Sequence, residues 1–407
     1  MHAHIPAIAG IPIEFILFAA VLAGVAVFHQ HSLRVALIGL AVITLYKIAF
    51  SSFHGGAGVG GLVAHLGQEW VLVINLLLLI IGFALLARHF EESRVPLLLP
   101  SLLPDDWKGG FAMLVAVFVL SSFLDNIAAA MIGGTMATAL YRGKVHVGFL
   151  AAIVAASNAG GSGSVVGDTT TTMMWIAGVR PLQVLEAYLA AVPALLFFGV
   201  VAARQQHAFQ PIMKDSPAGT TVDKARLGVV AAVLVAAIAA NVLGQFKQGA
   251  WLNQLPAIGL AVWATLLVLA PAVRPDWSVL PSATRGGVFL VSLVLSASMM
   301  PIEALPAASW HVALGLGFVS AVFDNIPLTA LALRQGGYDW GFLAYAVGFG
   351  GSMVWFGSSA GVALASQFPQ ARSVKAWVSG GWHVAVGYVL GFFVLLLVLG
   401  WHPDPAR

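Results

Sequence analysis

The sequence predicts an all-α polytopic membrane protein with about 11 transmembrane helices in two inverted repeats. Hydrophobic residues make up 60% of the 407 residues, and only 9% are charged. Soluble domains carry about 25% charged residues, so this chain cannot cover a water-facing surface. The apolar residues fall in long runs, and two copies of one polar pattern interrupt these runs roughly 200 residues apart.

The two copies share their order and chemistry. The first has Asp125-Asn126, followed by Asn158-Ala159-Gly160-Gly161-Ser162 and Gly167-Asp168. The second has Asp324-Asn325, followed by Gly350-Gly351-Ser352 and Gly357-Ser358. Duplicated halves with glycine-interrupted apolar segments at matching positions indicate a secondary transporter that binds its substrate between the repeats.

Apolar runs of nearly the ~20 residues that a spanning helix needs recur along the chain. We expect such helices near 12–29, 33–50, 70–88, 182–203, 227–244, 256–273, 286–301 and 377–400. Segments 111–141 and 306–333 are polar in the middle, and their apolar arms are too short to span, so we expect re-entrant hairpins. Segments 146–178 and 338–364 are predicted to be crossing helices broken at their glycines. Non-helical backbone at membrane depth needs protein or water around it, so the breaks predict a cavity.

These segments divide the chain into a first repeat at 1–203, a cytoplasmic linker at 204–226 and a second repeat at 227–407. With both ends of each hairpin on one side of the membrane, most Lys and Arg fall in loops on a single side. That side is expected to be cytoplasmic, which places both termini outside the cytoplasm. The opposite loops receive Arg180, Lys247 and Arg334.

The composition also excludes several classes of protein. The net charge is only +3, so membrane orientation explains the basic residues better than nucleic acid does. The chain has no cysteine, which excludes disulfides and thiolate metal sites. The sequence holds no nucleophile–base pair, nucleotide-binding loop or metal-ligand cluster, so we expect neither an enzyme nor a bound cofactor.

Polar residues gather at the hairpin tips and helix breaks. A carboxylate near the bilayer centre costs at least ~2.5–3.5 kcal/mol on insertion scales, so each intramembrane Asp is a functional candidate. Hard oxygen donors suit small hard cations, and a desolvated Asp could exchange a proton for such an ion. The candidate binding residues are Asp125, Asn126, Asn158, Gly160, Gly161, Ser162, Asp168, Thr169, Thr170, Asp324, Asn325, Gly350, Gly351, Ser352 and Ser358, with Na⁺ at Asp125, Asn158 and Asp168.

Structural roles are the alternative for each of these residues. A single Asp or Asn could be a helix cap, and the glycines could serve close helix packing. Helix N-termini after the breaks could also hold an anion. His65 and Glu69 are four residues apart and could relay protons or sense pH, although we favour a solvated pair at a helix end.

The motifs resemble the NhaD family of sodium/proton antiporters. The resemblance covers roughly 65–203 and 310–400, and its residues are Ser121–Asn126, Asn158–Gly161, Gly167–Thr171, Met174-Trp175, Phe323–Leu328, Gly350–Ser352 and Gly357–Ala363. That family belongs to the ion transporter superfamily, with citrate transporters, arsenite permeases and dicarboxylate/sodium symporters. The resemblance implies a scaffold, an elevator-type transport domain and a homodimer. It also implies that Asp125, Asn126, Asn158, Asp168, Thr169, Asp324 and Asn325 surround the ion.

Two departures from the family pattern affect the expected cargo. Ser162–Val166 replaces the usual aromatic residue and Ser-Pro pair, and Ala128–Ala130 replaces residues that often bear hydroxyls. Both changes make the pocket roomier, so a larger solute could enter.

Two functions therefore stay open. The first is a Na⁺(Li⁺)/H⁺ antiporter in which Asp125, Asp168 and Asp324 act by alternating access, with Na⁺ or Li⁺ and H⁺ as the transported or coupling ions. The alternative is a citrate/carboxylate or arsenite-type anion transporter coupled to Na⁺ or H⁺. The absence of Arg and Lys from the predicted site favours the antiporter. The expected partners are the lipid bilayer of a bacterial inner membrane, a small ion or anion and a second copy of the chain.

Overall fold

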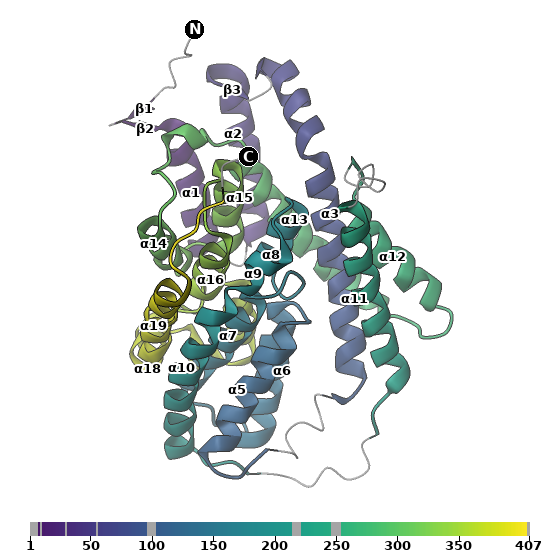
Figure 1. Ribbon diagram of the computed structural model, residues 1–407, viewed down its shortest axis with the longest axis vertical. Coiled ribbons are helices and arrows are strands. Elements are labelled where there is room, and N and C mark those ends of the chain that lie inside the picture. The colour runs from purple at the N-terminus through teal and green to yellow at the C-terminus, as the bar shows by residue number, and fades with distance from the viewer. Residues whose placement is uncertain are drawn as a thin grey trace.

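The computed structural model describes residues 7–8, 10–28, 31–53, 56–95, 103–213, 221–245 and 254–404, and these are almost entirely helical (Figure 1). Its strands form two short antiparallel pairs, β1 (Ala7–Ile8) with β2 (Ile11–Pro12) and β3 (Ser52–Phe53) with β4 (Gly56–Ala57). The first helices are α1 (Ile13–Val27), α2 (Ser32–Phe50) and α3 (Gly58–Glu92).

The segments that carry the first polar pattern are short helices. They are α5 (Trp107–Ser121), α6 (Asn126–Tyr141), α7 (Val147–Ser162), α8 (Thr169–Ile176) and α9 (Pro181–Leu185). Longer helices follow: α10 (Tyr188–Phe209), α11 (Lys224–Gln245), α12 (Ala257–Leu269) and α13 (Leu280–Ser298). The last set is α14 (Trp310–Ser320), α15 (Asn325–Gln335), α16 (Trp340–Gly350), α17 (Ser359–Gln367), α18 (Val374–Gly380) and α19 (Trp382–Leu399).

Length and apolar composition make this chain a multi-pass membrane protein. Within the described ranges, five helical segments are long and apolar enough to cross a bilayer: Ser32–Phe50, Gly58–Glu92, Pro181–Phe209, Trp277–Ser298 and Trp382–Leu399. The arms of both expected hairpins are shorter than the ~20 residues that a crossing requires.

Three expected boundaries need correction. The span expected at 70–88 is the 35-residue α3, which begins at Gly58. The linker expected from residue 204 begins later, because α10 continues to Phe209, and residues 214–220 of it lie outside the described ranges. Buried Gln206, in the part of α10 beyond residue 203, accepts a hydrogen bond at 2.7 Å from the backbone amide of His146, at the start of α7. The span expected at 377–400 is interrupted at Gly381, between α18 and α19.

Two hydrophobic cores hold the helices together. The larger core includes most of α5, α6, α7, α10, α16 and α19, and helix α7 is buried along nearly its whole length. The smaller core lies among α1, α2, α3 and α13, and it also takes apolar side chains from α8 and α15. Helix α3 contributes side chains to both cores, and α11 and α12 pack against it (Figure 1).

Candidate functional site

Each hairpin tip begins a helix with a capping aspartate. After α5 ends at Ser121, Asp125 caps α6, and its Oδ2 accepts a hydrogen bond from the amide of Ile127 at 3.2 Å. After α14 ends, Asp324 caps α15 in the same way, and its Oδ1 accepts from the amide of Ile326 at 3.1 Å. Aspartate at this position satisfies one of the free amides of the first helical turn.

The helix breaks are built alike, with one difference. Asp168 caps α8, where its two oxygens accept from the amide of Thr170 at 3.3 Å and from the Thr170 hydroxyl at 2.9 Å. Ser358 caps α17, and its Oγ accepts from the amide of Gly361 at 3.2 Å. A carboxylate in the first break thus corresponds to a hydroxyl in the second.

Asp168 lies where the two hairpins meet. Its carboxylate is 2% exposed, so it is almost completely buried. The side-chain amide of Asn126 donates to Asp168 Oδ1 at 3.4 Å, and the side-chain amide of Asn325 donates to Asp168 Oδ2 at 3.5 Å. Matching asparagines from the two halves of the chain therefore hold one carboxylate from opposite oxygens.

Asn158 links the two helix breaks. Its Oδ1 accepts from Asn126 at 3.1 Å, and its Nδ2 donates to Ser352 Oγ at 2.9 Å and to Ser358 Oγ at 3.2 Å. Asn158 is fully buried, so these bonds satisfy polar groups that water does not reach. The side chain of Ser162 bonds back to the carbonyl of Ala159 at 2.8 Å instead of joining this network.

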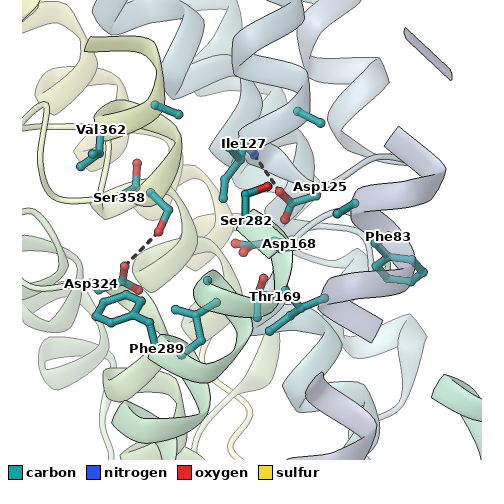
Figure 2. A pocket seen from close by; sticks show the side chains of 18 of the residues that line it. Phe83, Asp125, Ile127, Asp168, Thr169, Ser282, Phe289, Asp324, Ser358 and Val362 are labelled. Atoms are coloured by element: carbon teal, nitrogen blue, oxygen red, sulfur yellow. Dashed lines mark hydrogen bonds between the residues drawn. The ribbon is translucent and has the colours of Figure 1, made fainter. Parts of the chain in front are cut away.

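A cavity of about 620 Å³ opens onto the capping residues. Asp125, Asp168, Asp324 and Ser358 all line it, so the N-termini of α6, α8, α15 and α17 border one space (Figure 2). Thr169 lines the same space, and α3 and α13 supply many of the apolar side chains in the rest of the wall. Among the described residues, no three His, Asp or Glu side chains cluster closely enough to hold a metal ion. The three carboxylates therefore border one shared cavity but do not form a tight three-carboxylate cage.

One end of the cavity is charged. Arg88 and Glu91, in the last turns of α3, line it there together with Ser32 and Ser282. Arg88 bonds Glu91 at 3.1 Å and Asp276 at 2.9 Å. Hydrogen bonds from Ser278 and Arg88 hold the pKa of Asp276 below its ordinary value, so Asp276 stays ionised as the partner of Arg88. Of the described residues lining the cavity, Arg88 is the only Lys or Arg, and acids surround it.

The glycines of the breaks allow close helix packing. A Cβ on Gly160 would collide with the carbonyl of Phe118, and one on Gly350 with the backbone of Gly317. Gly161 and Gly351 pack against the carbonyls that precede Asp168 and Ser358, at 2.8 and 2.7 Å from their ideal Cβ positions. The same short approaches thus occur in both halves of the chain.

Sequence reasoning did not find the role of Tyr188. Its hydroxyl donates to Ser122 Oγ at 2.7 Å and contacts the Gly160 carbonyl at 3.0 Å, and Ser122 bonds the same carbonyl at 3.2 Å. This carbonyl, expected to be free for an ion, is therefore occupied by protein hydroxyls. Tyr188 follows the break by more than 20 residues, and no local pattern marks it.

His65 and Glu69 are not the solvated pair that we favoured from the sequence. His65 is 1% exposed and bonds Ser298 of α13 at 2.9 Å, and Glu69 forms an ion pair with Arg334 of α15. Both residues lie in the first turns of α3, ahead of the span expected at 70–88. Packing against α13 and α15 stabilises these turns and excludes water from the pair.

Two proteins of known name are similar to this chain. It is 28% identical over 331 residues to Sodium/proton antiporter 1 of Arabidopsis thaliana, an alignment that covers 70% of this chain and 52% of that protein. It is 27% identical over 328 residues to Sodium/proton antiporter 2 of the same plant, covering 70% and 73%. The chain thus spans about half the length of the first relative. No protein family profile matches the chain.

Proposed function

We propose that this protein exchanges Na⁺, or Li⁺, for H⁺ across a membrane by alternating access. The observation that carries the proposal is Asp168, a buried carboxylate that both asparagines of the duplicated pattern contact and that lines the cavity. The two relatives are named as sodium/proton antiporters, which supports the same ions here. No cofactor is needed for this exchange.

The charge of the site favours one monovalent cation. Each helix N-terminus carries a partial charge of about +0.5, so the four around the cavity contribute about +2. The three carboxylates contribute about −3 when all are ionised, which leaves a net charge of about −1. A single Na⁺ neutralises this site, and so does a single proton. Cation and proton then compete for the same place, and that competition couples their movements.

The arrangement of the cavity supports the order of events. Sodium arrives along the charged end near Arg88 and Glu91, and it exchanges its water for carboxylate, amide and hydroxyl oxygens. At the capped helix N-termini, the lining residues that offer such oxygens include Asp125, Asp168, Asp324, Thr169 and Ser358. We place Asn126, Asn158, Thr170, Asn325 and Ser352 behind them, where they orient the carboxylate of Asp168.

The repeated geometry supports a transporter of two inverted repeats, 1–203 and 227–407, of the NhaD type. Under this proposal the hairpins and broken helices form a transport domain that moves as an elevator against a scaffold that includes α3. A homodimer in a bacterial inner membrane, with both termini outside the cytoplasm, belongs to the same proposal.

The cavity is also large enough for a small organic anion, which keeps citrate-type or arsenite-type transport as the second candidate. Its deep wall nevertheless carries three carboxylates, and Arg88 is engaged by Glu91 and Asp276. An anion would have to approach these acids without a free cation to receive it. Cation exchange is therefore the better match to this site.

Purified protein in liposomes with an acidic interior tests the proposal. Sodium or lithium chloride added outside should dissipate the pH gradient, read by a pH-quenched dye, and potassium chloride serves as the comparison. No response to any cation, together with uptake of labelled citrate or arsenite, would establish the second candidate instead.

A further inference from the structure

Helix α15 connects the candidate ion site to a second charged contact. Its N-cap, Asp324, lines the cavity, and its first residue, Asn325, donates a hydrogen bond to Asp168. The helix is 11 residues long, and Arg334 lies in its last turn. At 1.5 Å per residue, about 15 Å of rigid helix separates the ion ligands from Arg334.

Arg334 forms an ion pair with Glu69 of α3. The two side chains are 19% and 15% exposed, so the pair is largely shielded from solvent. Shielding strengthens the attraction between the charges, and it also makes an unpaired charge costly at this place. A positive side chain in the last turn of α15 is further favoured by the helix dipole.

The neighbouring polar contacts tie the surrounding helices to one another. Lys47 of α2 donates to the carbonyl of Met299 at 2.7 Å, and His65 of α3 bonds Ser298 at 2.9 Å. Ser51 donates to Glu14 of α1 at 2.6 Å. These contacts join α1, α2, α3 and the end of α13, which share the smaller hydrophobic core. The Glu69–Arg334 pair adds α15, and through it the ion ligands, to this group.

The pair lies far from the charged end of the cavity. Glu69 is near the start of α3, whereas Arg88 and Glu91 line the cavity near its end. About 28 Å of helix separates Glu69 from Arg88 at 1.5 Å per residue. The cavity thus reaches the ion ligands from one end of α3, and the ion pair fastens α15 near the other end.

We propose that Glu69 and Arg334 form a clasp that positions α15 while the cavity opens at the Arg88 end, and that the clasp must separate before the ion site can open to the opposite side. Both are positioning residues, because they act on the ion through α15. The inference rests on the alternating access proposed above, but it does not depend on which ion is carried.

Cysteine labelling tests the clasp directly, since the natural chain has no cysteine. Ala128 lines the cavity beside Asp125, so Ala128→Cys reports from which face a membrane-impermeant maleimide reaches the site. The parent should label faster from the Arg88 face. The ratio of interest is the labelling rate from the Arg88 face divided by the rate from the opposite face. Glu69→Gln and Arg334→Gln should each lower this ratio at least threefold. The double variant should shift the ratio no further than either single variant, because the two side chains form one contact.

Two controls make the outcome decisive. Lys108→Cys, at an exposed position outside the cavity lining, should label equally in all backgrounds and shows that the protein is folded and oriented. Arg180→Gln removes an exposed positive charge outside the clasp and should leave the ratio unchanged. An unchanged ratio in both single variants, or single effects that simply add in the double variant, would overturn the clasp.

A second measurement covers Gln variants that fail to fold. In a variant that carries both Glu69→Cys and Arg334→Cys, a reducible bifunctional thiol reagent would join the two side chains. The joined protein should keep the parent's preference for labelling from the Arg88 face. It should also lose ion exchange until the cross-link is reduced. Exchange that continues in the joined protein would overturn the clasp. If the parent exchanges no cation at all while the labelling ratio still shifts, the clasp stands and the proposed cargo is wrong.

Discussion

The charge of the candidate site is decided by which residues cap four helices. Three caps are aspartates and one is Ser358, although the surrounding backbone repeats in both halves. Each cap satisfies a helix terminus, so its side chain would be needed even without an ion. The carboxylates exceed this structural need, because asparagine and serine cap helices about as well as aspartate. Their charge is therefore the property that points to a cation.

Replacing Asp168 with asparagine separates these two roles. Asp168→Asn keeps a capping side chain for α8 but removes the charge that both Asn126 and Asn325 contact, so Na⁺-driven dissipation of a pH gradient should fall at least 10-fold. The matched control is Asp106→Asn, the same change at the exposed cap of α5, where Asp106 accepts from Lys108. Equal losses in both variants would show that the loss does not come from the charge at Asp168.

Replacing Ser358 with aspartate should make the second break resemble the first. A fourth carboxylate changes the net charge of the site from about −1 to about −2, so Ser358→Asp should lower the half-saturating sodium concentration several-fold at alkaline pH. Ser358→Asn, of nearly the same shape but neutral, should not lower it. Titration of sodium against the rate of exchange in liposomes measures both variants, and a lower value for the Asn variant as well would contradict the charge argument.

At the scale of elements, the short helices meet through glycines at their ends. The last turn of α7 lies against α5 because Gly160 has no side chain to collide with the Phe118 carbonyl. The hydroxyl of Tyr188, from α10, contacts the Gly160 carbonyl at the same place. Gly350 meets the backbone of Gly317 in the other half. The helix ends therefore hold the capping residues at fixed positions relative to one another.

An alanine at Gly160 should open this contact. Gly160→Ala must displace α5 from α7, and overpacking of this kind costs about 1–3 kcal/mol, so the thermal unfolding temperature in detergent should fall. Gly228→Ala in α11 is the matched control, because no atom lies within 4 Å of its added methyl group. Since alanine is the better helix former, this control should unfold at the same or a higher temperature. A Gly160→Ala protein as stable as the control would contradict the packing role.

At the scale of the whole molecule, one cavity is bordered by segments from both halves of the chain. Residues of α6, α8, α15 and α17 line it on one side, and residues of α3 and α13 line it as well (Figure 2). The charged network at the end of α3 and the Glu69 clasp lie near opposite ends of that helix. The molecule is therefore asymmetric along α3, with access at one end and a closed contact at the other.

The proposed topology predicts which loops share a face of the membrane. Lys144, before α7, and Arg180, after α8, are both exposed, and the broken helix between them should cross the bilayer. In inverted and right-side-out vesicles, Lys144→Cys should label from the cytoplasmic face together with Ser282→Cys, and Arg180→Cys from the other face. Labelling of Lys144→Cys and Arg180→Cys from the same face would disprove the crossing and the orientation built on it.

The membrane class and the polar segments were determined by the sequence, because both depend on local composition. So few charges cannot cover a soluble surface, and a polar group in an apolar run stands out wherever the chain places it. Asp125, Asp168 and Asp324 could be singled out for this reason. Helix boundaries were less certain, since the glycine-rich start of α3 is helical only because His65 and Glu69 find partners on α13 and α15.

Only the tertiary structure decided which of these groups meet. Asn158 bonds Ser352 and Ser358 across 194 and 200 residues of chain, and Arg334 reaches Glu69 across 265. Such contacts depend on how helices pack, which residue spacing does not encode. The sequence by itself determined that buried acids and amides exist in two matching sets. The fold decided that Asp168 receives both asparagines, that Tyr188 contacts the Gly160 carbonyl, and that α15 carries Asp324 at one end and the ion pair of Arg334 with Glu69 near the other.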